Sequence, residues 1–221
     1  MEEIAGNFGI SADNYIKLIY LILRIYANIP IVIFGEKWCG KFIIVKKLAE
    51  FINNGDHNTL TLEIHSDTSE KNIIEFIEKE VIEESIFLNN KENEKKKMYE
   101  EKGLFYDTKK LIVILRGINT CKSMGIISEI ICKHSYQGKP LPSNIVFIGI
   151  CESYTQEEDR FIEIAKKMEL KEEKLEKIRK IKYEDLYPLP FSLLNYIINF
   201  GNLAIRVKKY ILNDYLDIIL K

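Results

Sequence analysis

Residues 35–41, which read Gly-Glu-Lys-Trp-Cys-Gly-Lys, restrict the fold more than any other segment. They fit the pattern G-x-x-x-x-G-K and lie between a wholly apolar run, Ile31–Phe34, and a run with helical periodicity, Lys41–Ile52. In such a unit the glycines let backbone N–H groups surround phosphates, and the helix N-terminus adds partial positive charge. The pattern predicts a nucleotide-binding phosphate loop made of Gly35, Glu36, Lys37, Trp38, Cys39, Gly40 and Lys41.

Apolar runs alternate with helical patterns through the first two thirds of the chain. The runs are short and continuous, which is typical of strands covered on both faces. Strands that alternate with helices predict an α/β fold, here of the P-loop NTPase type, with a parallel sheet, right-handed crossovers and helices on both faces. We expect strands at residues 31–34, 59–65, 111–115 and 144–151, and helices at residues 14–27, 41–52, 69–88 and 121–133.

The pattern changes after residue 151. The remainder is charged and rich in helix-forming residues, with interruptions at Pro188 and Pro190. The polar run at residues 89–102 predicts a solvated loop or insertion. We expect helices at residues 156–184, 191–200 and 204–220, and hence an α/β subdomain at residues 1–155 followed by a charged linker and a C-terminal helical lid at residues 156–221.

Charge and metal-ligand content exclude several classes of function. Lys and Arg number 32 against 33 Asp and Glu, so the net charge of -1 gives no electrostatic reason to expect nucleic acid as a partner. A zinc finger or RING domain needs clustered ligands, whereas the cysteines and histidines here are far apart, so we expect no zinc and no metal site. These isolated residues are Cys39, Cys121, Cys132, Cys151, His57, His65 and His134.

Residues 15–34 are apolar enough to raise the question of a membrane span. Lys17, Arg24 and Pro30 interrupt them, and each cation near the bilayer centre costs about 2.5–3.5 kcal/mol on insertion scales. The segment therefore predicts a buried helix and a buried strand. Residues 1–9 are acidic and lack the features of a signal peptide, and unpaired cysteines suit a reducing compartment, so we expect a cytoplasmic location.

The residues that hydrolyse nucleotide in P-loop ATPases are missing from their expected positions. The residue after the loop lysine should offer a hydroxyl to Mg²⁺, and here it is Phe42. The strand at residues 111–115 should end in acids for the metal and the water, and it is followed by Arg116 and Gly117. Glu152 stands where a polar residue should position the water. We expect no catalytic residue, and any ATP or ADP to bind without Mg²⁺.

Two roles are open for each of three residues in or near the phosphate loop. Trp38 could stack on an adenine or pack against the lid, and Glu36 could activate water or remain a solvated carboxylate. Arg116 could neutralise phosphate in the absence of Mg²⁺, or pair with a nearby carboxylate such as Glu63 or Glu152.

Two proline-rich segments carry a family resemblance. Residues 135–142 (Ser-Tyr-Gln-Gly-Lys-Pro-Leu-Pro) precede an apolar strand, and residues 186–194 (Leu-Tyr-Pro-Leu-Pro-Phe-Ser-Leu-Leu) precede Asn199-Phe200-Gly201. In this order, behind the phosphate loop, they resemble the AAA+ core of the mysterin-type giant RING-finger ubiquitin ligases. The resemblance implies a AAA+ module beside other AAA+ modules of the same or a larger polypeptide, with ubiquitin transfer by separate zinc-bearing parts.

The resemblance keeps the scaffold but not the residues that carry the chemistry. The first hypothesis is a degenerate AAA+ module with a structural or regulatory function and without hydrolysis. The alternative is an active or nucleotide-binding ATPase with atypical site residues, and whether the chain is an enzyme stays open. A third hypothesis, another P-loop class such as a small kinase or a STAND-type switch, does not explain the two Pro-Leu-Pro segments.

Overall fold

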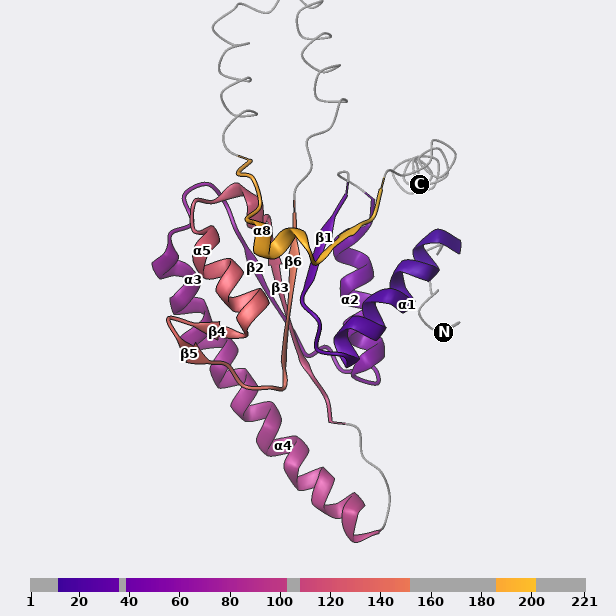
Figure 1. Cartoon of the computed structure of the whole chain (residues 1–221). Coiled ribbons are helices and arrows are strands. Elements are labelled where there is room, and N and C mark those ends of the chain that lie inside the picture. Colours follow the sequence, from indigo (N-terminus) through magenta and orange to yellow (C-terminus); the bar gives the residue numbers. More distant parts are fainter. Residues whose placement is uncertain (1–11, 36–38, 103–107, 152–185, 202–221) are drawn as a thin grey trace, which may run out of the picture.

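A five-stranded sheet with the order β2-β3-β6-β1-β7 forms the centre of the protein, and all its neighbouring strands run parallel (Figure 1). The computed structural model describes residues 12–35, 39–102, 108–151 and 186–201. The α/β class expected from the sequence is confirmed. The strands of the sheet are β1 (Ile31–Phe34), β2 (Thr59–Glu63), β3 (Leu111–Arg116), β6 (Ile145–Ile150) and β7 (Ile197–Asn199).

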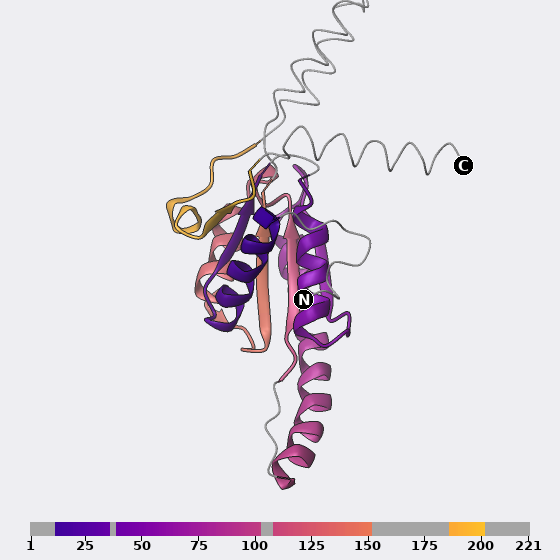
Figure 2. The ribbon, with the colours of Figure 1, turned by 90° about the vertical axis from the view of Figure 1, so that its right-hand side faces the viewer.

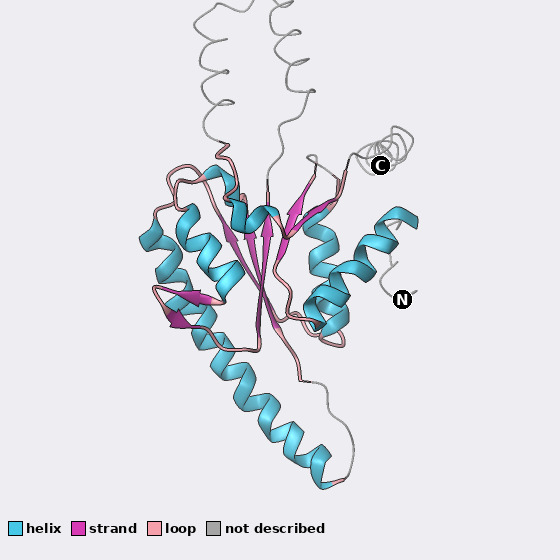
Figure 3. Cartoon of the chain, in the orientation of Figure 1, coloured by secondary structure: helices cyan, strands magenta, loops and turns pink. Residues whose placement is uncertain are grey.

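Helices cover both faces of the sheet (Figure 3). On one face α1 (Ala12–Tyr26) and α2 (Lys41–Ile52) pack on the sheet. The other face carries the crossovers that follow β2 and β3, together with the short α8. Those elements are α3 (Glu70–Phe76), the π-helical turn η2 (Ile77–Val81), α4 (Ile82–Glu101), the 3₁₀ turn η3 (Ile118–Thr120), α5 (Met124–Ser128), the π-helical turn η4 (Glu129–Lys133) and α8 (Phe191–Leu194).

Strand β3 shows why the strands are apolar without alternation. Leu111, Val113 and Leu115 belong to the core beneath α3 and α5, while Ile112 and Ile114 belong to the core beneath α1 and α2. All five side chains are fully buried. A strand with helices on both faces has no solvent side, so every position has to be apolar.

Residues 89–102 do not form the expected loop, because α4 continues to Glu101 (Figures 1 and 2). The run contains no Gly or Pro, and its many Lys and Glu residues are good helix formers. Lys96 pairs with Glu100 at 3.8 Å across one turn. Glu92 is buried, and its carboxylate accepts the backbone N–H of Lys109 at 3.2 Å. The expected loop was wrong because a polar run without a helix-breaking residue can extend a helix, and an insertion at these residues stays a prediction.

Residues 191–200 do not form a helix either. The helix α8 ends after one turn at Leu194, and β7 then pairs with β1, with Val32 opposite Ile197. Strand β1 pairs with β6 on one edge, and the backbone groups of its other edge also need hydrogen-bond partners inside the protein. Ile197 and Ile198 are β-branched and therefore suit a strand. This part of the expected lid was therefore wrong. The expected helices at residues 156–184 and 204–220, and the boundary near residue 155, lie outside the described residues.

The proline-rich residues 135–142 form a small antiparallel hairpin of β4 (Ser135–Tyr136) and β5 (Lys139–Pro140). The N–H of Gly138, in the turn, donates to the carboxylate of Glu129 at 2.8 Å. This hydrogen bond is the main reason why the pKa of Glu129 lies below its ordinary value. In the described part of the chain, no helix is both long and apolar enough to cross a membrane.

Two cations of α1 hold β7 in place. Arg24 donates to the carbonyl oxygens of Tyr196 at 2.6 Å and Pro30 at 3.2 Å, and Lys17 donates to the carbonyl oxygen of Phe200 at 2.7 Å. The two cations that interrupt the apolar segment thus connect the first described helix to the last strand of the sheet.

We expect Arg24→Ala to lower the stability of the protein by about 1–3 kcal/mol, because it removes the partly buried hydrogen bonds to the carbonyl oxygens of Tyr196 and Pro30. Hydrogen exchange of the amides at residues 196–200 should accelerate, and Tm should fall. Lys47→Ala is the matched control, since Lys47 makes an exposed ion pair with Glu50 on α2. Equal changes in Tm for the two variants would contradict this function of Arg24.

Candidate nucleotide-binding site

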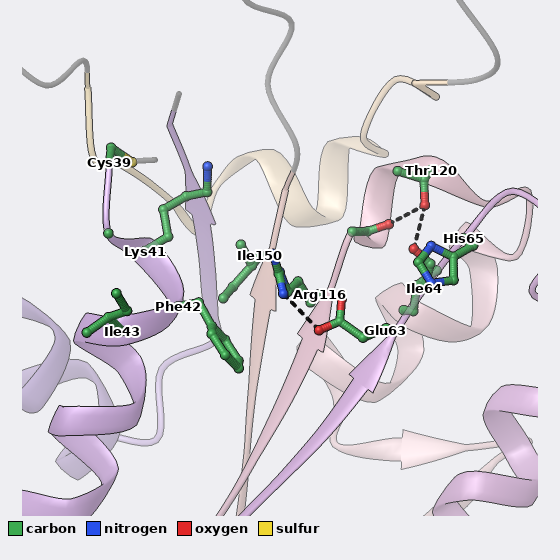
Figure 4. Close-up of a pocket in the computed structure, with 12 residues that line it drawn as sticks. Cys39, Lys41, Phe42, Ile43, Glu63, Ile64, His65, Arg116, Thr120 and Ile150 are labelled. Atoms are coloured by element: carbon green, nitrogen blue, oxygen red, sulfur yellow. Dashed lines mark hydrogen bonds and ion pairs between the residues drawn. The ribbon is translucent and has the colours of Figure 1, made fainter. Parts of the chain in front are cut away.

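The strand order places a cleft at the carboxyl edge of the sheet. The chain passes from β1 to the far edge at β2, returns through β3 and β6, and crosses β1 to reach β7. Such a reversal is where α/β sheets bind ligands. The cleft has a volume of about 540 Å³ and lies where β2, β3 and β6 end beside the start of α2 (Figure 4). It is lined by Cys39, Gly40, Lys41, Phe42, Ile43, Glu63, Ile64, His65, Arg116, Gly117, Thr120 and Ile150.

Backbone conformation favours glycine at position 40 of the phosphate loop, and close packing favours it at position 35. Gly40 immediately precedes α2 with φ 81° and ψ 10°, a left-handed conformation that glycine adopts without strain. Gly35 follows β1, and a Cβ there would lie 3.0 Å from Cβ of Phe200 and 3.1 Å from Sγ of Cys39. The structure thus brings together Gly35, Cys39, Gly40 and Lys41. Glu36, Lys37 and Trp38 lie outside the described residues.

Lys41 is directed at the loop and away from the rest of the cleft. Its side chain is buried, and Nζ donates to the carbonyl oxygen of Gly35 at 2.6 Å (Figure 4). Cys39 is buried beside it, and this burial raises the pKa of the thiol, although nearby Lys41 opposes the rise. Cys39 is therefore a protonated thiol at neutral pH, and Lys41 is the cationic residue among the described residues of the loop.

Phe42 follows Lys41 and points into the cleft between two cations. Nζ of Lys46, one turn later in α2, lies 4.5 Å from the centre of the phenyl ring. Cζ of Arg116, at the end of β3, lies 5.0 Å from the same centre. Both distances are within the roughly 6 Å range of cation–π interactions. The position that should offer a hydroxyl to a metal therefore carries a ring held between positive charges.

Arg116 pairs with Glu63, as one of the two interpretations from the sequence predicted. Nη1 of Arg116 donates to Oε1 of Glu63 at 2.9 Å, and the pair joins the ends of β3 and β2. The two side chains are 41% and 46% exposed, so solvent weakens the ion pair. The other proposed partner, Glu152, lies outside the described residues.

Gly117 occupies a position that cannot hold a carboxylate. Its φ is 77°, and a Cβ there would lie 2.6 Å from the carbonyl oxygen of Ile64. Its N–H donates to the carbonyl oxygen of Ile150 at 2.8 Å, which fixes the turn against β6. The sequence shows that an acid is absent from this position. The structure adds that the backbone leaves no room for any side chain here.

Thr120 and His65 are polar residues of the cleft that did not figure among the site residues predicted from the sequence. The hydroxyl of Thr120 lies 2.8 Å from the carbonyl oxygens of both Ile64 and Gly117, and so closes the turn after β3. The exposed ring of His65 lines the cleft beyond β2. Their positions directly after apolar strands were the available signal. Across the described ranges, no three His, Cys, Asp or Glu side chains are grouped so that they could hold a metal ion.

The family model of the RNF213 AAA domain matches residues 8–155, which include α1, the strands from β1 to β6 and the cleft. The chain belongs to this family. The match confirms the resemblance indicated by the two proline-rich segments, and the fold is that of a AAA-type P-loop NTPase.

The RNF213 AAA domain described here is similar to long curated relatives. It is 25% identical over 211 residues to E3 ubiquitin-protein ligase rnf213-beta of Danio rerio, covering 89% of this chain. It is 25% identical over 218 residues to E3 ubiquitin-protein ligase RNF213 of Homo sapiens, covering 92% of this chain. It spans only 4% of the length of each of these relatives.

We expect Gly117→Ala to destabilise the domain by about 2–4 kcal/mol. Alanine would adopt a strained left-handed backbone, and its Cβ would clash with the carbonyl oxygen of Ile64, directly after β2. Gly125→Ala is the matched control, since Gly125 lies in α5 and a Cβ there would meet nothing within 4 Å. That control should change stability by about 1 kcal/mol at most. Urea unfolding of both variants measures the difference, and a tolerated Gly117→Ala would contradict the backbone argument.

Proposed function

We propose that this RNF213 AAA domain is a pseudo-ATPase, a module that keeps the P-loop scaffold for a structural or regulatory function and does not hydrolyse ATP. The observation that supports this most is that Phe42, Arg116 and Gly117 stand at the positions of the metal hydroxyl and the two acids. The structure connects these residues through the Phe42–Arg116 contact at 5.0 Å and the turn of Gly117.

Each of these residues removes a different part of the chemistry. Phe42 offers no oxygen to Mg²⁺, and Arg116 brings positive charge to the place where the metal should be held. Gly117 leaves no carboxylate to activate water, and Glu152 is proposed to replace the residue that positions it. Glu63 is the acid among the described lining residues, and Arg116 already pairs with it. An active ATPase would need a carboxylate available to a metal or to water.

The phosphate-binding half of the site supports retained nucleotide binding. Gly35 and Gly40 keep the backbone geometry of the loop, and Lys41 keeps its cation beside it. We propose that residues 35–41, including Glu36, Lys37 and Trp38, bind ATP or ADP without Mg²⁺. Arg116 would then supply part of the positive charge that the metal normally brings.

The relatives are much longer polypeptides than this chain. Their printed names describe E3 ubiquitin-protein ligases, and the chain spans 4% of their length. We propose that it works beside other AAA modules and that any ubiquitin transfer depends on other parts of such a polypeptide. The buried thiols of Cys39 and Cys121 form no disulfide, which suits a reducing compartment, and we propose the cytoplasm.

We expect the chain to show no ATP turnover above background, with or without Mg²⁺, because loss of the metal ligand, the metal acid and the water-activating acid each costs orders of magnitude in rate. A coupled phosphate-release assay on the wild type and Lys41→Ala measures it. A turnover of about 1 s⁻¹ that disappears in Lys41→Ala would contradict the proposal.

We expect ATP and ADP to bind with equal affinity in Mg²⁺ and in EDTA, and Lys41→Ala to weaken both. Titration followed by the fluorescence of Trp38, the single tryptophan of the chain, measures this binding. Lys47→Ala is the control for loss of a lysine from α2, because its ammonium pairs with Glu50 outside the cleft. A strong dependence on Mg²⁺ would contradict metal-free binding, and absence of binding in both conditions would show that the loop survives only as a structural turn.

A further inference from the structure

Four side chains from three elements form one connected group in the cleft. Phe42 and Lys46 come from the first turns of α2, Arg116 ends β3, and Glu63 ends β2. Lys46 and Arg116 lie 4.5 Å and 5.0 Å from the centre of the Phe42 ring. Arg116 donates to Glu63 at 2.9 Å, and Figure 4 shows these two side chains with Phe42. We call these four residues the clasp.

The clasp joins the elements that a metal ion joins in an active P-loop site. There, Mg²⁺ binds both the hydroxyl at the start of the loop helix and the carboxylate at the end of the acidic strand. Phe42 and Arg116 occupy those two sequence positions, and their side chains contact each other directly. The contact therefore spans the same gap between α2 and β3 without an ion.

We propose that the clasp replaces the metal ion as the link between α2 and the ends of β3 and β2, and that it excludes divalent cations from the site. This inference rests on the proposed function and extends it, because it makes the loss of metal binding a stabilising feature of the fold. The arrangement of the loop helix on the sheet then does not depend on Mg²⁺.

The charges of the described lining residues support metal exclusion. Lys41 and Arg116 bring two positive charges to the cleft, with Lys46 beside Phe42 as a third. Glu63 is the one acid among the described lining residues, and its carboxylate is engaged by Arg116. A divalent cation would have to displace a guanidinium to obtain a single carboxylate, while it faced the other positive charges.

The chemistry of both partners suits this link. A planar guanidinium can stack on an aromatic ring and pair with a carboxylate at the same time, which an ammonium does less well. Both cations lie over the phenyl ring, which takes no hydrogen bond away from the loop. The exposed ion pair alone would stabilise little, so the coupling between Phe42 and Arg116 is the part that a measurement can detect.

A double-mutant cycle on the full chain tests the link. Phe42→Leu keeps apolar volume without the ring, and Arg116→Met keeps the aliphatic stem without the charge. We expect each to lower Tm by about 2–5 °C, and the double variant to lose less than the sum of the two. Lys139→Met is the matched control, since Lys139 lies 5.6 Å from the ring of Tyr136 in the β4–β5 hairpin and should add independently to Phe42→Leu.

Metal exclusion is measured on the wild-type chain, so that it does not depend on a variant that folds. Mn²⁺ is titrated with ADP and followed by electron paramagnetic resonance, with ADP alone as the reference. We expect no protein-dependent Mn²⁺ binding, and the same Tm in Mg²⁺ and in EDTA. Saturable Mn²⁺ binding by the protein would overturn the exclusion, and strict additivity of Phe42→Leu and Arg116→Met would overturn the link. Neither Mn²⁺ binding nor additivity of the two substitutions measures ATP turnover. The pseudo-ATPase proposal is therefore tested separately, by the phosphate-release assay.

Discussion

Strand β1 has to satisfy backbone hydrogen bonds on both of its edges inside a sheet that is covered on both faces. Ile31, Val32 and Ile33 are fully buried, and β6 and β7 supply the partners on either side. Because β1 lies between strands that come much later in the chain, its carboxyl end opens at the reversal of strand order. The turn that follows has to reach α2 within a few residues, and Gly35 and Gly40 provide the space and the left-handed backbone for it.

The rest of the site follows from what surrounds that turn. The ends of β2 and β3 bring Glu63 and Arg116 opposite the start of α2, where Phe42 points toward them. An active site of this type holds a cation between acids, whereas here a guanidinium lies between a ring and an acid. Arg116 already engages the carboxylate of Glu63, so in the proposed clasp a guanidinium takes the place of the metal ion. The backbone at Gly117 leaves no room for an acid, because a Cβ there would clash with the carbonyl oxygen of Ile64, directly after β2.

These features support the structural or regulatory function that we propose for this member of the RNF213 AAA domain family. The core residues, the strand order and the loop glycines preserve the shape of the module, and the residues that differ are those that would contact metal and water. Lys41 is directed at its own loop, with Nζ on the carbonyl oxygen of Gly35. A retained phosphate ligand would take over that hydrogen bond.

The sequence by itself determined the α/β class, four of the five strands and the family. It also predicted a phosphate loop between β1 and α2 without the usual metal and water ligands, and this stays a prediction. These features follow from local patterns: continuous apolar runs, glycine spacing and short motifs. Only the tertiary structure decided that residues 197–199 form the fifth strand, because the open edge of β1 determines it, and that residues 89–101 continue α4. It also decided that Arg116 stacks on Phe42 and that Gly117 has no room for a side chain. Those facts depend on how the ends of β2, β3 and α2 meet, and no single segment of the chain contains that information.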